Sequence, residues 1–263
     1  MADNADLRQG QPLKADGAAR DGMDNVEVLE TGATRSLRFA GSPALQSRMS
    51  LLQPDALDLQ YTRMMLGFLL FAPVPRDMLM IGLGGGSLAK FCHRYLPTTN
   101  ITVVEIDPAV IALREHFLVP PDGPRLRVVQ GDGADYVAAH QEVADVLLID
   151  GYDHAGLPAQ LATPAFYRDC RAVLRPDGML SVNLHLEALH HASCLQGLLA
   201  AFPEGLVEAL DDDMTNSIVL ARNGAWPPLD DLGALRRPEG LARDAWRQLM
   251  PTLRIIAATL TLR

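Results

Sequence analysis

An apolar run that leads directly into a glycine cluster most constrains the fold of this chain. Met78–Ile81 is uniformly apolar, Gly82–Gly86 follows it, and Ser87–Tyr95 then has helical character. A second apolar run, Ile101–Val104, ends in the acidic residue Glu105. Glycine lets the backbone turn with positive φ and lets a ligand approach the main chain closely. A carboxylate at the end of the next strand can accept hydrogen bonds from ribose hydroxyls. The pattern predicts an α/β domain that binds a nucleotide or nucleoside.

From Met78 onward, strand-like and helix-like segments alternate with short connections. This alternation predicts βαβ units and a mostly parallel sheet. Only Asp211–Asn216 joins the last two strands, which is too short for a parallel crossover, so these strands should pair antiparallel. The expected strands are Met78–Gly82, Ile101–Glu105, Leu126–Gln130, Val146–Asp150, Met179–Leu184, Leu206–Leu210 and Ser217–Ala221. The expected helices are Ser87–Tyr95, Pro108–Phe117, Ala134–His140, Pro164–Leu174 and Glu187–Phe202.

We therefore expect an α/β fold of the Rossmann-like class I methyltransferase type, with a seven-stranded, mostly parallel sheet whose last strand is antiparallel. The expected regions are a disordered tail (1–24), an N-terminal β-hairpin annex (25–63), the nucleoside-binding α/β domain (64–222) and a C-terminal tail with a weak helix (223–263).

Within these regions, the annex should form a hairpin around Gly32, to which Gln46–Gln53 adds one more strand. Pro54 begins a helix-compatible pattern that stops before Pro75. The weak helix of the C-terminal tail is expected at Gly240–Met250, before an apolar end at Leu253–Leu262 that packs on the domain or on a partner subunit.

Composition excludes several classes of partner. A net charge of −9 argues against nucleic acid, because the phosphates would be repelled. The longest apolar run, Met64–Pro73, is too short to span a membrane, and residues 1–24 lack the apolar block of a signal peptide. The three cysteines form no CxxC pair, which indicates reduced thiols and a cytoplasmic location. No zinc-like ligand spacing appears, so we expect no metal.

Four successive strands end in acidic or glycine-rich signals, at Gly82–Gly86, Glu105–Asp107, Gly131–Gly133 and Asp150–Asp153. The carboxyl ends of parallel strands lie on one edge of the sheet, where ligands bind. One such signal is an ordinary turn, but four in register favour a bound nucleoside. The G-x-G-x-G spacing, with Ser87 where the third small residue would fall, does not fit a dinucleotide fingerprint, and the P-loop lysine of ATP sites is missing.

These motifs resemble the spermidine synthase-like aminopropyltransferases, over about Leu45–Leu186. Residues 73–82 are similar to the family's proline-rich approach to its first strand, Val104–Ile111 to its ribose-binding segment, Gly131–Gly133 to its adenine-binding segment, Leu148–Asp153 to its D-x-x-D active-site loop, and Ala165–Gly178 to the following helix and turn.

The resemblance implies that Glu105 binds ribose, Asp132 binds adenine, Asp150 is the general base and Asp153 grips the substrate amine. A carboxylate suits this base, because an alkylammonium must lose a proton before its nitrogen can attack. The implied donor-binding residues are Gly82, Gly84, Gly85, Gly86, Glu105, Ile106, Asp132, Gly133 and Asp150. The implied substrate-binding residues are Gln60, Tyr61, Tyr152 and Asp153.

The sequence also departs from the family. Gly85 stands where the family has an aspartate that holds the amino end of decarboxylated S-adenosylmethionine, which leaves room for the carboxylate of intact S-adenosylmethionine. The family's Tyr-Gln pair is Gln60-Tyr61 here, and the proline after the D-x-x-D motif is His154. The acceptor and the form of the donor therefore stay open.

We expect a transferase that moves an aminopropyl group from an S-adenosyl sulfonium to a small-molecule amine acceptor, such as a polyamine. The alternatives are a methyl or amino-carboxypropyl transferase that uses intact S-adenosylmethionine, and a non-catalytic nucleoside-binding protein. We also expect a homodimer. The resemblance implies one, and the apolar helix Met64–Phe71 and the N-terminal hairpin should leave apolar surface that a small annex cannot bury.

Overall fold

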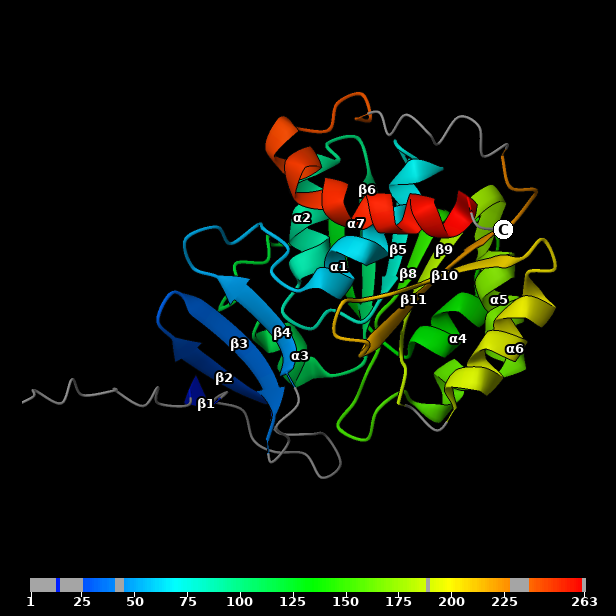
Figure 1. Cartoon of the computed structure of the whole chain (residues 1–263). Helices are drawn as coiled ribbons and strands as arrows, with labels where there is room; N and C mark the ends of the chain where they lie inside the picture. Colours follow the sequence, from blue (N-terminus) through cyan, green and yellow to red (C-terminus); the bar gives the residue numbers. More distant parts are fainter. Residues whose placement is uncertain (1–12, 15–25, 41–44, 188–189, 228–236, 262–263) are drawn as a thin grey trace, which may run out of the picture.

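The computed structural model describes residues 13–14, 26–40, 45–187, 190–227 and 237–261 (Figure 1). Its centre is a seven-stranded sheet with the strand order β10-β11-β9-β8-β5-β6-β7. All pairings among β9, β8, β5, β6 and β7 are parallel, whereas β11 pairs antiparallel with both β9 and β10. The strands are β5 (Asp77–Ile81), β6 (Asn100–Glu105), β7 (Leu126–Gln130), β8 (Ala144–Ile149), β9 (Leu174–His185), β10 (Leu206–Leu210) and β11 (Asn216–Arg222). The expected fold class is confirmed.

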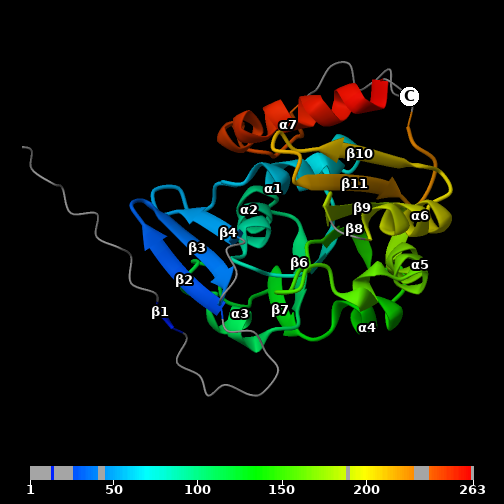
Figure 2. The ribbon, with the colours of Figure 1, turned by 60° about the horizontal axis from the view of Figure 1, so that its bottom comes forward.

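Helices cover both faces of this sheet (Figure 2). One face packs on α1 (Gln60–Met65), the 3₁₀ helix η1 (Leu66–Leu70), α2 (Ser87–Tyr95), α3 (Pro108–Ala112) and α7 (Arg243–Thr261), and the other on α4 (Gly133–Ala138), η2 (Ala159–Ala162), α5 (Pro164–Val173) and α6 (His191–Ala201). Burial on both faces explains why the strands are continuous apolar runs. In β5, Met78 and Met80 belong to one core cluster, and Leu79 and Ile81 belong to the other.

The N-terminal residues form a separate antiparallel sheet beside α2 (Figures 1 and 2). It consists of β1 (Leu13–Lys14), β2 (Val26–Thr31), β3 (Thr34–Phe39) and β4 (Leu45–Ser50). Gly32 has φ +58° in the turn between β2 and β3, as expected for the hairpin. Leu13–Lys14 pairs with β2, so the segment expected to be a disordered tail contains two paired residues. The other residues of 1–24 lie outside the described part of the chain.

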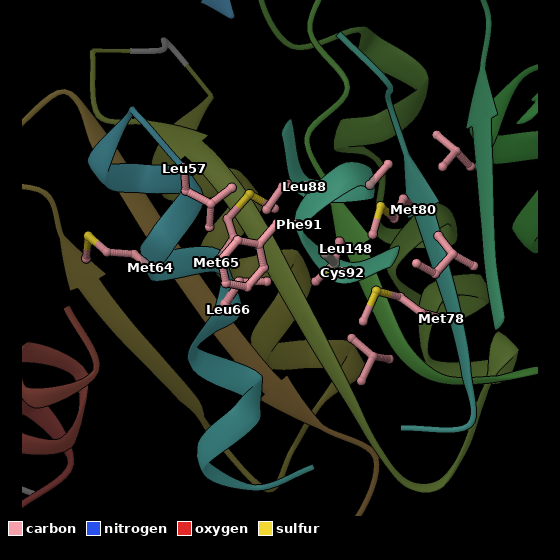
Figure 3. Packing of buried hydrophobic residues seen from close by; sticks show 14 of the residues in the cluster. Leu57, Met64, Met65, Leu66, Met78, Met80, Leu88, Phe91, Cys92 and Leu148 are labelled. Atoms are coloured by element: carbon pink, nitrogen blue, oxygen red, sulfur yellow. The ribbon is translucent and has the colours of Figure 1, made fainter. Parts of the chain in front are cut away.

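The segment before β5 differs from the expectation. Helix α1 begins at Gln60 rather than near Pro54, because side chains satisfy the backbone of Leu57. Gln248 of α7 accepts a hydrogen bond from the Leu57 nitrogen at 2.8 Å, and Arg63 donates to the Leu57 carbonyl at 2.7 Å. The apolar segment is buried within the chain: Met64, Met65 and Leu66 are fully inaccessible and share a cluster with α2 (Figure 3).

Other helices and strands also begin or end at residues that differ from the prediction. The tail forms one helix, α7, that continues through Pro251 to Thr261 and packs against α1, η1 and β10. Because α7 covers η1 and α1, the expectation that Met64–Phe71 leaves an apolar surface is wrong. Helix α3 stops at Ala112 instead of Phe117, and β9 begins five residues earlier than expected, at Leu174. Among the described residues, no helix is long and apolar enough to cross a membrane.

Candidate active site

A cavity of about 810 Å³ opens at the carboxyl edge of the parallel strands. The ends of β5 and β6 and the residues that follow β7 and β8 line it, together with residues from β3 and β4 of the N-terminal sheet. All the expected site residues line this cavity except Gly86. Gly86 instead precedes α2 with φ +65°, and a Cβ there would lie 2.3 Å from the side chain of Val119.

The glycine loop fits closely against the loop that follows β8. Gly82 has φ +94°, and a Cβ at this position would lie only 2.2 Å from the carbonyl oxygen of Asp150. The backbone nitrogen of Asp150 in turn donates to the carbonyl of Ile81 at 2.9 Å. A side chain at Gly82 would therefore push apart the two loops that carry the predicted donor and acceptor sites.

Glu105 holds the glycine loop in place from the end of β6. Its Oε2 accepts a hydrogen bond from the Leu83 nitrogen at 2.7 Å, and its Oε1 accepts one from the Asp107 nitrogen at 2.9 Å. Burial raises the pKa of Glu105, and these backbone N–H groups partly offset that rise. Since a carboxylate can accept about four hydrogen bonds, Glu105 can still accept from a ligand.

The predicted adenine side of the cavity follows β6 and β7. Asp132 precedes α4, and its Oδ1 accepts a hydrogen bond from the Ala134 nitrogen at 2.7 Å. Gln160 donates to Oδ2 of the same carboxylate at 3.4 Å. Ile106 lines the cavity with 52% of its surface exposed, although it is a large apolar residue. The apolar Ile106 side chain could contact the face of a flat base, and the Asp132 carboxylate could accept a hydrogen bond from its edge.

Asp150 follows β8 and has two side-chain partners. The Tyr61 hydroxyl donates to its Oδ2 at 3.3 Å, and the amide nitrogen of Asn183 donates to its Oδ1 at 2.9 Å. Burial raises the pKa of Asp150, and the two hydrogen bonds oppose that rise. Burial, followed by the charge of Asp150, raises the pKa of Tyr61 well above its ordinary value, so its hydroxyl remains a donor at neutral pH.

The remaining predicted residues, Asp153, Tyr152 and Gln60, also line the cavity. Asp153 accepts a hydrogen bond at Oδ1 from the Ala155 nitrogen at 2.7 Å, in a loop closed by its own bridge to Gly156. The Tyr152 hydroxyl donates to the Asn183 carbonyl at 2.9 Å. Gln60 lines the cavity, but its amide oxygen accepts a hydrogen bond from the Asp212 nitrogen at 3.0 Å. That contact ties α1 to the turn between β10 and β11.

Sequence reasoning missed several lining residues. Asn183 and His185 lie two apart on β9, and the His185 ring stacks on Tyr152 with centroids 4.0 Å apart. An amide side chain in the mostly apolar strand Met179–Leu184 was an available signal, because buried polar groups require partners. Ser47 gave no local signal. It reaches the cavity only because β4 packs against the glycine loop.

Ser47 also explains the departure at Gly85. A Cβ at Gly85 would lie 2.5 Å from the Ser47 hydroxyl oxygen and 2.9 Å from the ring of Phe117. Ser47 is 6% exposed and Phe117 is 1% exposed, so neither has free space around it. An aspartate at this position, as in the family that the sequence resembles, would require both neighbours to move.

The charge of the cavity has one sign. Its described lining residues include seven carboxylic acids and neither lysine nor arginine. The acids are Glu105, Asp107, Asp132, Asp150, Asp153, Asp211 and Asp213. Glu105 and Asp150 lose hydration on burial, which disfavours their ionised forms, and a cationic ligand would offset that cost. Among the described residues, those of the cavity included, no group of three or more His, Cys, Asp and Glu side chains is arranged to hold a metal ion.

Comparisons with known proteins agree with this geometry. Residues 58–197 match the spermine/spermidine synthase domain. A polyamine aminopropyltransferase of Chromobacterium violaceum is 38% identical over 220 residues, covering 83% of this chain and 84% of that protein. The structure of a probable spermidine synthase from Corynebacterium glutamicum superposes with a TM-score of 0.67 at 22% identity, covering 79% of this chain and 80% of that one.

Human methyltransferase-like protein 13, solved in complex with SAH, superposes with a TM-score of 0.58 at 26% identity. The superposition covers 77% of this chain and 93% of the human protein's chain. The resemblance inferred from the glycine loop and the acidic strand ends is confirmed by the matched domain and the curated relative. The chain therefore belongs to the spermine/spermidine synthase family of transferases.

Proposed function

We propose that this protein transfers the aminopropyl group of decarboxylated S-adenosylmethionine to a primary amine of a polyamine. The observation that carries the proposal is the row of seven carboxylic acids, without lysine or arginine, among the described residues that line the cavity. The decarboxylated donor carries a sulfonium and an ammonium but no carboxylate, and the acceptor carries only ammonium groups. Both substrates therefore match the charge of the cavity.

In this proposal the nucleoside lies across the ends of β5, β6 and β7. Glu105 accepts hydrogen bonds from the ribose hydroxyls through the lone pairs that Leu83 and Asp107 leave available. Asp132 accepts from the adenine amino group, and Ile106 contacts the face of the base. The sulfonium then lies over the glycine loop, toward Asp150.

The reaction forms an N–C bond and breaks a C–S bond. The nitrogen's electron pair attacks the carbon next to sulfur, and the C–S electron pair goes to sulfur, which leaves as the neutral thioether methylthioadenosine. Asp150 accepts the proton that the nitrogen must lose. Asp153 supplies counter-charge to the amine, and alignment of nitrogen, carbon and sulfur supplies much of the remaining rate.

The second candidate is methyl or amino-carboxypropyl transfer from intact S-adenosylmethionine. It is favoured by the similarity to a methyltransferase-like protein that was solved with SAH, and by the absence of a side chain at Gly85. The charge of the cavity opposes it, because a methionine carboxylate would meet seven acids and, in the described lining, neither lysine nor arginine. A non-catalytic nucleoside-binding protein would have no use for the buried Asp150, whose ionisation burial disfavours.

We also propose that residues 25–63 act as an annex that closes one wall of the cavity over the domain 64–222.

The family resemblance supports a homodimer, whereas the segment Met64–Phe71, which is largely buried within the chain, lends it no support. Light scattering at micromolar concentration should give twice 28.5 kDa, and a 28.5 kDa particle would refute the dimer.

A cytoplasmic location is supported by the three cysteines, which are all buried as free thiols, and cell fractionation would test it.

Product analysis tests the activity. The protein is incubated with decarboxylated S-adenosylmethionine and an α,ω-diamine, and the products are identified by mass spectrometry. The proposal predicts methylthioadenosine together with a diamine that has gained one aminopropyl group. A methylated diamine formed with intact S-adenosylmethionine, and no product from the decarboxylated donor, would replace this proposal with the second candidate.

A further inference from the structure

The side chain of Asn183 is buried beside the predicted base. It projects from β9, lines the cavity and is 2% exposed. Its Nδ2 lies 2.9 Å from Oδ1 of Asp150. An ionised carboxylate only accepts hydrogen bonds, so the nitrogen must face Asp150 and the amide oxygen must face elsewhere.

That amide oxygen is buried without a partner. Within the described part of the chain, Oδ1 of Asn183 makes no hydrogen bond. Leaving a buried acceptor unpaired is unfavourable, and native structures contain few such atoms. An orphaned acceptor on a cavity-lining residue is most simply satisfied by an N–H or O–H group of the ligand.

The strand order shows which ligand Asn183 faces. Its strand β9 lies next to β8, which carries Asp150, whereas β5 and β6, which carry the glycine loop and Glu105, lie on the other side of β8. Tyr152, whose ring stacks on His185, donates a hydrogen bond to the Asn183 backbone carbonyl on this side. Asn183 is therefore separated from the predicted nucleoside site by the strand of the base, and it faces the predicted acceptor side.

We propose that Asn183 binds the attacking amine, an assignment that rests on the proposed function. At the moment of attack a primary amine directs its electron pair at the carbon and has two N–H groups left. Asp150 has already taken one proton from the ammonium; its carboxyl group accepts a hydrogen bond from one remaining N–H, and Oδ1 of Asn183 accepts one from the other. The C–S electron pair goes to sulfur, as in the parent reaction. The same amide thus orients the base through its nitrogen and the nucleophile through its oxygen.

This arrangement selects primary over secondary amines. A secondary amine has a single N–H after its electron pair is directed at carbon, and that N–H can pair with the Asp150 carboxyl group or with Oδ1 of Asn183 but not with both. One of these two buried acceptors then lacks a hydrogen bond in the transition state, which slows the reaction.

The test compares an α,ω-diamine with the same diamine methylated once on each nitrogen, with decarboxylated S-adenosylmethionine as donor. Asn183→Leu has a similar shape without polar atoms, so it creates no room for the methyl group. Tyr61→Phe is the matched control, because it removes the other hydrogen bond to Asp150 and leaves Oδ1 of Asn183 in place. We expect the wild-type preference in kcat/KM for the primary diamine to fall about tenfold in Asn183→Leu and to stay unchanged in Tyr61→Phe.

Methylthioadenosine binding checks that each variant is folded. If Asn183→Leu does not fold, the preference in kcat/KM for the primary diamine is measured in Asn183→Ala instead. A role confined to orienting Asp150 would slow both diamines equally, so an unchanged preference in the Asn183 variants would overturn the assignment. If the wild type alkylates neither diamine, the proposed function itself fails. If the wild type is active and the preference does not move, only the role of Asn183 fails.

Discussion

The hydroxyl of Tyr61 donates a hydrogen bond to Oδ2 of Asp150 at 3.3 Å, although 89 positions separate the two residues. Tyr61 belongs to α1, which precedes the whole α/β sheet, and Asp150 follows its fourth strand along the chain, β8. The contact places the linking helix in the active site. Because this bond and that of Asn183 lower a pKa that burial raises, it also adjusts the acidity of the predicted base.

The first prediction concerns that bond. Tyr61→Phe removes a hydrogen bond that stabilises the carboxylate, so the pKa of Asp150 should rise further above its ordinary value. The base is active when ionised, so the acidic limb of the kcat–pH profile should move to higher pH. Well above that limb, the rates of variant and wild type should approach each other. A limb that stays in place would show that Asp150 is not the group titrating there.

The second prediction concerns Asp150 itself. Asp150→Asn should retain methylthioadenosine binding and lower kcat by roughly 10²–10⁴-fold, the usual contribution of a positioned base. Calorimetry and steady-state kinetics on the same preparation measure both quantities. Turnover near the wild-type value would remove Asp150 from the mechanism.

The same variant should be more stable at neutral pH. Burial raises the folded-state pKa of Asp150, so its contribution to stability is present below the unfolded pKa and is lost as pH rises through the folded pKa. At neutral pH the ionised group therefore opposes folding, and asparagine avoids this cost. Thermal unfolding should show a higher Tm for Asp150→Asn at pH 7, and the difference should shrink on acidification.

The third prediction concerns the ribose site. In Glu105→Gln an amide NH₂ would face a backbone N–H of Leu83 or Asp107, and the charge available to ribose would be lost. Methylthioadenosine should bind about 1.5–3 kcal/mol more weakly. Asp122→Asn is the control, since it removes the same charge from a side chain that does not line the cavity. Equal affinity of the two variants would take Glu105 out of the site.

The fourth prediction concerns the glycine loop. A methyl group at Gly85 would meet the Ser47 hydroxyl and the Phe117 ring, so Gly85→Ala should lower the free energy of unfolding by about 1–3 kcal/mol. Combining it with Ser47→Gly should recover part of the loss beyond additivity. Gly123→Ala is the control, because its methyl would meet only the Pro121 carbonyl oxygen, at 4.0 Å. Denaturant unfolding that gives equal losses for Gly85→Ala and Gly123→Ala would contradict the packing described here.

The central sheet could be predicted because its strands are buried on both faces and so read as apolar runs. The ends of β7 and β10 agree with the sequence to the residue. The converging acidic residues were predictable for a related reason, since parallel strands end on one edge. Contacts between distant parts of the chain were not predictable. Helix α7 covers Met64–Leu69; both segments are apolar in sequence, but nothing in either pattern shows that they pack against each other.

The site residues also divide into those that the local sequence predicts and those that depend on contacts between distant segments. Asp150 and Glu105 could be found because each follows an apolar strand. Gln60 was expected to bind substrate, but its amide oxygen accepts from the Asp212 nitrogen, a contact that exists only once the β10–β11 turn lies over α1. Asn183 had a local signal as a polar residue in a buried strand, but its role could be inferred only once β9 lies beside β8, because its partner is Asp150.

The central claim is that the cavity is built for a polycation, and competition between the two donors tests it most directly. Isothermal titration of the wild type with decarboxylated and with intact S-adenosylmethionine, at matched pH and ionic strength, measures how the cavity discriminates against one carboxylate. Seven acids without lysine or arginine in the described lining predict tighter binding of the decarboxylated donor. Equal affinities, or tighter binding of intact S-adenosylmethionine, would contradict the account.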